Sequence, residues 1–162
     1  MYDAYIVAAD SPDPSTQNAA MLWNAQGQLL GVDCNRFPNG VQDLPERWER
    51  PLKYEIIEHA ERNAIFWAAA RGRDTLGSTM IAPWAACSDC ARAIIQVGVA
   101  RLVRHQQATD HANAVAAPGK DWSGTITTAD TMFKEAGVEV IDLNCTFGGK
   151  VTIKHCGEVW KP

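Results

Sequence analysis

The sequence predicts an α/β sandwich, because strand-like and helix-like segments alternate along its second half. A second observation is a hairpin pattern near the N-terminus, at residues 18–34, which adds an antiparallel pair to the sheet. A third is the absence of any internal repeat or linker-like stretch in the 162 residues. We therefore expect a partly parallel sheet within a single domain that covers residues 1–162.

The elements of the first half are read from turn residues and apolar spacing. Two short apolar runs flank a turn at residues 25–27, which is typical of a β-hairpin. Residues 35–51 contain three prolines and a glycine, so we expect a long loop, and loops of such length are usually functional. Residues 52–71 have apolar side chains at spacings of three and four, which predicts a helix that ends at Gly72.

The second half supplies the alternation. Strands are expected at residues 78–83, 101–105 and 138–143, and helices at residues 88–97 and 128–136, the last of them stopped by Gly137. The polar stretch 106–125 is expected to be a loop, and residues 151–153 an additional edge strand.

Composition limits the class of protein. Apolar residues make up 46% of the chain and charged residues 21%, as in ordinary globular proteins. No apolar run reaches the roughly 20 residues of a membrane helix, and the N-terminus lacks the pattern of a signal peptide, so we expect a cytoplasmic protein without a membrane partner. A net charge of -4 weighs against a nucleic-acid partner.

The five cysteines favour metal binding or burial over disulfides, because their number is odd and no secretory signal is visible. Two of them, Cys87 and Cys90, form a C-x-x-C motif where a strand gives way to a helix, and His59 lies early in the preceding helix. Imidazole nitrogen and thiolate sulfur are ligands of zinc, and a catalytic zinc site keeps three protein ligands and one open position. We predict that these three residues bind Zn²⁺.

Glu61 follows His59 by two residues, and two such side chains diverge by about 200° in a regular helix. Both can face one metal only if the helix begins close to His59, so residues 52–57 should lead into it. Glu61 is then placed beside the metal as the catalytic residue, which takes a proton from water and passes it to a departing amine.

These motifs resemble those of the cytidine and deoxycytidylate deaminase superfamily, and deoxycytidylate (dCMP) deaminases most. Beyond the H-x-E and C-x-x-C segments, the resemblance includes DPSTQ at residues 13–17, CNRFPNG at 34–40, RPLKY at 50–54 and the helix after Cys90. It covers roughly residues 10–143. Ala86 stands where the family usually has proline, and the helix that normally precedes DPSTQ is nearly missing from the sequence.

The resemblance implies a three-layer α/β/α sandwich with a mixed five-stranded sheet, and hydrolysis of dCMP to dUMP and ammonia. Asn35 would bind the sugar, the Ala60 N–H would bind the pyrimidine carbonyl, and carbonyls near Trp84 or Ala85 would accept the amine. Many members respond to dCTP and dTTP and form hexamers. A homo-oligomer, either hexamer or dimer, and these effectors are therefore expectations from the family, and no residue here carries them.

Several other residues have a functional and a structural interpretation. Arg36 and Arg50 are candidates for binding a phosphate, although either can be an ordinary surface residue. Trp84 and Trp122 can stack on a base or serve only in packing. Asn63 is expected to support the site by bonding the loop that carries Asn35. Cys34, Cys145 and Cys156 are interpreted as thiols without a function, and a second metal site at His155 and Cys156 is disfavoured.

Two alternative functions stay open. The Asn35-Arg36 pair also occurs in tRNA adenosine deaminases, so the substrate can be a base in tRNA or single-stranded nucleic acid, or another free cytosine or purine nucleoside or nucleotide. A catalytically inactive nucleotide sensor is the third interpretation, which the presence of Glu61 disfavours.

Overall fold

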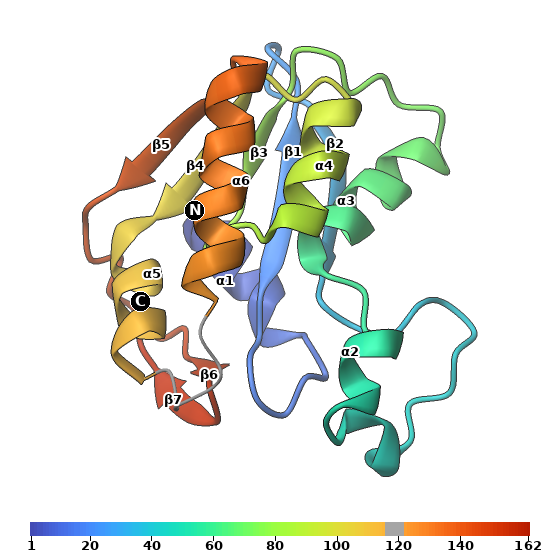
Figure 1. The fold of residues 1–162 in the computed structure, drawn as a ribbon, viewed down its shortest axis with the longest axis vertical. Helices are drawn as coiled ribbons and strands as arrows, with labels where there is room; N and C mark the ends of the chain where they lie inside the picture. The colour runs from blue at the N-terminus through green and yellow to red at the C-terminus, as the bar shows by residue number, and fades with distance from the viewer. Residues whose placement is uncertain (116–121) are drawn as a thin grey trace.

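The computed structural model describes residues 1–115 and 122–162 and contains a mixed five-stranded sheet in the order β2-β1-β3-β4-β5 (Figure 1). The strands are β1 (Ala19–Trp23), β2 (Leu29–Cys34), β3 (Thr79–Ile81), β4 (Arg101–His105) and β5 (Glu139–Leu143). β1 pairs antiparallel with both β2 and β3, whereas β3, β4 and β5 run parallel. The predicted hairpin and the partly parallel sheet are therefore confirmed.

Helices cover both faces of this sheet, with α3, α4 and α6 on one face and α1 on the other (Figure 1). They are α1 (Tyr2–Ala9), α2 (Leu52–Ile56), α3 (Ala60–Ala69), α4 (Ser88–Gln96), α5 (Gln106–Val115) and α6 (Ser123–Ala136), and a 3₁₀ turn spans Pro45–Trp48. α6 ends where Gly137 takes a left-handed conformation, as predicted. The three-layer α/β/α sandwich is confirmed.

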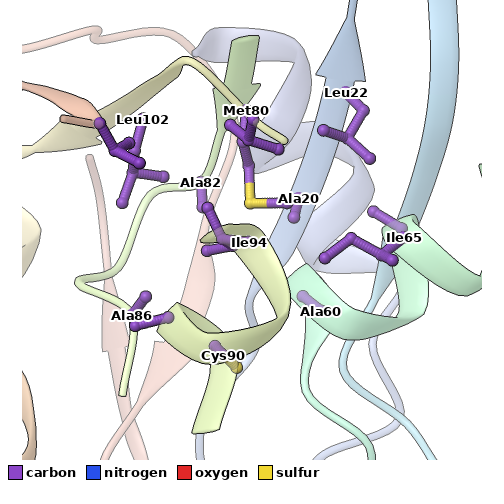
Figure 2. Packing of buried hydrophobic residues seen from close by; sticks show 14 of the residues in the cluster. Ala20, Leu22, Ala60, Ile65, Met80, Ala82, Ala86, Cys90, Ile94 and Leu102 are labelled. Atoms are coloured by element: carbon purple, nitrogen blue, oxygen red, sulfur yellow. The ribbon is translucent and has the colours of Figure 1, made fainter. Parts of the chain in front are cut away.

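Small residues let the helices approach the sheet closely beside the first turns of α3 and α4. In Figure 2, Met80 of β3 lies beside Ala20 of β1, and Ala60 of α3 and Cys90 of α4 lie below them in the same cluster. These side chains are buried. Gly31 of β2 lies so close to α3 that an added Cβ would come within 2.2 Å of the Ala64 carbonyl oxygen. This tight packing fixes the N-terminal end of α3 against the sheet.

A second core joins α1, α5 and the C-terminal segment on the other side of the sheet. Buried Tyr5 of α1, Ala108 of α5 and Ile153 pack with Trp84 in this cluster. The Tyr5 hydroxyl forms a 2.5 Å hydrogen bond with Nδ1 of His105 at the end of β4. The C-terminal segment is thus packed onto the domain by aromatic contacts.

Three predictions of elements were wrong or incomplete. Residues 106–115 form α5 rather than a loop, because alanines at 108 and 112 give this polar stretch one apolar stripe; residues 116–121 lie outside the described part. The tail adds no edge strand to the main sheet. Instead β6 (Ile153–His155) and β7 (Glu158–Trp160) form a separate hairpin. A helix of 8 residues, α1, which is about two turns, precedes DPSTQ although this helix was expected to be nearly missing.

None of the helices among the described residues is long and apolar enough to cross a membrane.

Candidate metal centre and its cavity

His59 lies at the break between α2 and α3, where the chain changes direction before the long helix. Its backbone is extended, with φ -74° and ψ 151°, and it is the N-cap of α3. The helix therefore begins at Ala60, as the spacing of His59 and Glu61 required. Because His59 stands outside the regular helix, its side chain and that of Glu61 can reach the same point.

Cys87 and Cys90 are placed by the first turn of α4. Cys87 is the N-cap of that helix, and its carbonyl oxygen accepts the Ala91 N–H at 2.9 Å. Residues three apart in a helix lie on one face, so the two sulfurs point the same way. Both thiols are buried. Two helix N-termini thus meet at one place, and their dipoles favour thiolates there.

The three predicted ligands converge. Nδ1 of His59 lies 3.5 Å from the sulfur of Cys87 and 3.4 Å from that of Cys90. Zn–S bonds of about 2.3 Å and Zn–N bonds of about 2.0–2.1 Å in a tetrahedron place nitrogen and sulfur about 3.6 Å apart. All three ligand atoms lie within 4.8 Å of one another, and they are the one such group among the residues described. The arrangement fits a tetrahedral metal with two sulfurs and one nitrogen.

Glu61 is buried beside these ligands, 3% exposed, with Oε2 at 3.6 Å from the sulfur of Cys90. Burial raises the pKa of its carboxyl, although the charge of His59 opposes the shift. A carboxyl with a raised pKa in a cavity is suited to accept a proton and give it back. Glu61 therefore lies beside the three candidate metal ligands and is not part of that group.

Cys87 and Cys90 shift each other's pKa in opposite directions. The hydrogen bond from Cys90 lowers the pKa of Cys87 to about 4, with His59 acting in the same direction. That bond and burial raise the pKa of Cys90. Burial lowers the pKa of His59, but its hydrogen bond with Cys87 and the charge of Glu61 raise it overall. Cys87 is therefore the first of the pair to become a thiolate.

The ligands open into a cavity of about 550 Å³, within the range of small-molecule sites. His59, Ala60, Glu61 and Cys87 form one part of its wall. As the first residue of α3, Ala60 has a backbone N–H with no partner inside the helix. Ala60 and Glu61 therefore line the same cavity as two of the metal ligands, His59 and Cys87.

Asn35 lines this cavity and organises its neighbouring wall. Its amide nitrogen donates to Asp13 at 3.0 Å and to the Thr16 carbonyl at 2.8 Å. Its amide oxygen accepts from Ser11 at 2.8 Å and from the Asn18 N–H at 2.7 Å. These four bonds use the whole capacity of the side-chain amide. The predicted bond from Asn35 to a sugar stays a prediction, and it requires one of these partners to be exchanged.

Asp13 and Lys53 form a buried ion pair in the same wall, with 2.7 Å between the carboxylate oxygen and Nζ. Asp13 also accepts the Ser15 and Thr16 N–H groups, at 2.8 and 3.1 Å. The DPSTQ segment is thus a turn that is held by hydrogen bonds from its backbone to the Asp13 carboxylate. Lys53 ties that turn to α2, so its charge is already balanced by protein.

Asn63 links α3 to the loop that follows β2, as expected. Its amide nitrogen donates to the Cys34 carbonyl at 2.9 Å and, at 3.4 Å, to that of Glu58. Backbone bonds between Arg36 and Glu58, at 2.9 and 3.2 Å, hold the same loop to the segment before His59. These bonds therefore fix the position of His59 relative to Asn35.

The other candidates divide between cavity and surface. Trp84, Ala85 and the exposed Arg50 line the cavity. The guanidinium of Arg50 lies 5.4 Å from the Tyr54 ring and has no carboxylate partner in the described part of the chain. Arg36 lies outside the lining and pairs with Asp33 at 2.6 Å. Of the two arginines proposed for phosphate, only Arg50 faces the cavity.

The tryptophans also differ. Trp84 is buried, donates to the Gln17 carbonyl at 3.2 Å, and stacks on His155 with ring centroids 3.7 Å apart. Trp122 is 45% exposed at the cavity wall, 6.2 Å from the rings of His59 and Tyr54. Trp84 therefore serves in packing, and Trp122 leaves an aromatic surface open to a ligand.

Four residues of the lining come from α5 and the C-terminal hairpin and were not predicted from the sequence as part of the site. They are Thr109, Ala112, His155 and Cys156. The signal was weak, since α5 was assigned to a loop and the hairpin lies outside the resemblance. Among the residues described, His155 and Cys156 belong to no group of three potential metal ligands. Cys34 is buried, while Cys145 and Cys156 are exposed.

Three protein ligands, a buried carboxyl and an adjoining cavity define a mononuclear metal site of the catalytic type. The family model for the cytidine and deoxycytidylate deaminase zinc-binding region matches residues 1–106. The chain therefore belongs to this zinc-binding deaminase family, and His59, Cys87 and Cys90 are the residues that fit its zinc. A second model, the BMC domain, matches only the short stretch 119–160, and no functional conclusion follows from it.

Individual relatives agree with this assignment. An "uncharacterized deaminase in luxG 3′region" from Aliivibrio fischeri is 34% identical over 137 residues, which are 85% of this chain and 86% of that protein. The deoxycytidylate deaminase of Homo sapiens is 32% identical over 106 residues. That match covers 62% of this chain and 58% of the human protein, so the chain spans little more than half of this named relative.

Solved structures share the fold. A dCMP deaminase from cyanophage S-TIM5, in complex with dCMP and dUMP, superposes with a TM-score of 0.63 at 20% identity, covering 88% of this chain and 92% of that one. A diaminohydroxyphosphoribosylaminopyrimidine deaminase/reductase from Thermotoga maritima has a TM-score of 0.57 at 20% identity, covering 88% of this chain and 34% of that one. At such identity these likenesses show the fold alone.

Proposed function

We propose that this chain is a zinc-dependent dCMP deaminase, which converts dCMP and water to dUMP and ammonia. The observation that carries the proposal is the joint placement of metal ligands, Glu61 and one unpaired arginine around a single cavity. The names of several relatives support this substrate, since proteins from human, mouse and phage T4 are called deoxycytidylate deaminases.

Each part of the reaction has a residue to perform it. When bound by His59, Cys87 and Cys90, zinc supplies a Lewis acid that makes water a nucleophile near neutral pH. The N–H of Ala60 binds the pyrimidine carbonyl, and the carbonyl oxygen of Trp84 or Ala85 accepts the exocyclic amine. Glu61 takes a proton from the attacking water and transfers it to the amine as the C4–N bond breaks.

The charges of the cavity favour a single nucleotide over a polynucleotide. Lys53 is neutralised by Asp13, so Arg50 is left as the unpaired cation in the described part of the lining. One arginine suits one phosphate, whereas a strand of nucleic acid is usually bound along a groove of several cations. The chain's net charge of -4 points the same way.

The direct test is ammonia release from the zinc-loaded protein with dCMP, CMP, deoxycytidine, cytosine and a single-stranded oligonucleotide. We expect the highest kcat/KM with dCMP. Arg50→Gln should raise KM for dCMP about tenfold, the loss of a charge-assisted hydrogen bond, and leave deoxycytidine unaffected. Arg47→Gln is the matched control, since Arg47 lies in the same region but outside this lining. Absence of turnover on every monophosphate would end the proposal.

A polynucleotide deaminase is the second candidate. The exposed ring of Trp122 favours it, because such enzymes stack extruded bases on aromatic side chains. Oligonucleotide binding that weakens steeply with salt would support it.

The expected homo-oligomer and the effectors dCTP and dTTP belong to the dCMP proposal. They are tested by sedimentation and by adding each triphosphate to the assay.

A further inference from the structure

Three buried polar atoms in the lining of the cavity have no hydrogen-bond partner in the described part of the protein. They are Oδ1 of Asn18, Oγ1 of Thr109 and Nδ1 of His155. A buried polar atom without a partner costs free energy, and such atoms are rare in folded proteins. Six side-chain atoms of this kind occur in the described part of the protein, and three of them lie around this one cavity, which indicates that a ligand there supplies the missing partners.

Backbone hydrogen bonds and ring stacking hold His155 and its hairpin in place. The hairpin is held against the DPSTQ turn, because the Gly157 N–H donates to the Ser15 carbonyl at 2.8 Å and the Gln17 N–H to that of Lys154 at 2.9 Å. The ring of His155 is 4% exposed and lies on that of Trp84 at an angle of 12°. His155 therefore has a set orientation and cannot turn freely toward solvent.

The side chains of Asn18, Thr109 and His155 carry no charge near neutral pH. Burial lowers the pKa of His155 to about 4, and the neighbouring His111 acts in the same direction. Asn18 and Thr109 have no charge at any ordinary pH. Neutral donors and acceptors complement hydroxyl groups, whereas a phosphate is better matched by an arginine or lysine. The chemistry here differs from that at Arg50.

We propose that Asn18, Thr109 and His155 form a hydroxyl subsite, which binds uncharged hydroxyl groups of the substrate's sugar and thereby favours nucleosides and nucleotides over free bases. The subsite lies apart in sequence from the metal motifs, on α5, the C-terminal hairpin and the residue before β1. The proposal rests on the proposed function only in taking the substrate to be a cytosine nucleoside or nucleotide.

Two substitutions remove the polar atoms and keep the shapes. Thr109→Val replaces a hydroxyl by a methyl group, and His155→Phe keeps a ring to stack on Trp84. Oγ1 of Thr109 and Nδ1 of His155 have no protein partner, and Nε2 of His155 has only a 3.9 Å contact with the sulfur of Cys156. The double variant should therefore be about as stable as the parent. The matched control is Thr128→Val on the exposed face of α6, outside the lining.

The measurement is calorimetric binding of deoxycytidine, 2′,3′-dideoxycytidine and cytosine to zinc-loaded protein that carries Glu61→Gln to prevent turnover. In that background we expect each lost hydroxyl to weaken binding about threefold to tenfold, as for one neutral hydrogen bond. The double variant keeps Asn18 and Asn35, so it should still prefer deoxycytidine, but it should discriminate among the three ligands several-fold less than the parent. The control should discriminate like the parent.

Discrimination that is undiminished in the double variant, or that is absent from the parent, would overturn the subsite. A double variant that is less stable and discriminates like the parent would show a structural role instead. The proposed function has a separate readout, because ammonia release from dCMP by the wild type can fail while the sugar-dependent difference in Kd remains. If no cytosine ligand binds the parent, both proposals are wrong.

Discussion

Gly31→Ala should weaken both the fold and the active site, although Gly31 touches no metal ligand. A Cβ at this position would lie 2.2 Å from the Ala64 carbonyl oxygen and 3.2 Å from the Ala68 Cβ. Ordinary contact distances exceed 3 Å, so α3 must move away from β2 by about 1 Å. Such overpacking costs about 1–3 kcal/mol of unfolding free energy.

The same displacement reaches the chemistry, because α3 carries His59, Ala60 and Glu61 at its N-terminal end. A misplacement of about 1 Å can lower catalysis about 100-fold. We expect urea denaturation to show the loss of stability and ammonia release to show a lower kcat/KM. Gly124→Ala is the matched control, since nothing lies within 4 Å of its added Cβ and it stands in α6.

Gly124→Ala should be neutral or stabilise the protein by up to about 1 kcal/mol, because alanine favours a helix. The two substitutions are thus predicted to change stability in opposite directions. A Gly31→Ala variant with wild-type stability and kcat/KM would refute the argument that close packing of α3 on β2 sets the position of the site.

Further predictions concern single side chains. Glu61→Gln should retain zinc and ligand binding while kcat for ammonia release falls about 10²–10⁴-fold; unchanged turnover contradicts the assigned role. Asn63→Leu should lower the unfolding free energy by about 1–3 kcal/mol, measured in urea, because the Cys34 carbonyl loses its partner; a neutral effect argues against this link. The depressed pKa of His155 means that the unfolded chain binds its proton first, so wild-type stability should fall, relative to His155→Phe, by up to about 3 kcal/mol between pH 6.5 and 4. Parallel pH profiles of the two proteins would show that His155 does not titrate this way.

The metal centre could be predicted from the sequence because its residues are local. His59 and Glu61 are neighbours at a helix start, and the C-x-x-C motif is held by one helical turn, so each half is determined by backbone geometry alone. The break between α2 and α3 followed from the same geometry. The distance between the halves is set by the pairing of β1 with β3, and the sequence predicted these strands but not that they pair.

The far wall of the cavity could not be predicted, because it depends on contacts between segments distant in the chain. Thr109 faces the cavity only because α5 forms, and its sequence is polar enough to suggest a loop. His155 arrives through backbone bonds between the hairpin and residues 15–17. Short strands of three residues carry little periodicity, so the hairpin was mistaken for an edge strand.

The arginines illustrate a similar limit. Arg36 and Arg50 look equivalent in the sequence, since both belong to the long loop region. A carboxylate three residues away, Asp33, engages Arg36, with Nε at 2.9 Å from Oδ1, and turns it from the cavity. Arg50 forms no ion pair in the described part of the chain and stays available to a ligand. Only the course of the backbone separates these two outcomes.

The central claim, that His59, Cys87 and Cys90 together hold one zinc ion, is tested most directly by metal analysis combined with X-ray absorption at the zinc edge. We predict one zinc per chain, coordinated by two sulfurs at about 2.3 Å and lighter ligands at about 2.0–2.1 Å. Cys90→Ser should remove one sulfur from the spectrum and lower the zinc content. Protein that purifies and stays folded without zinc, or a spectrum without sulfur ligands, would contradict the account.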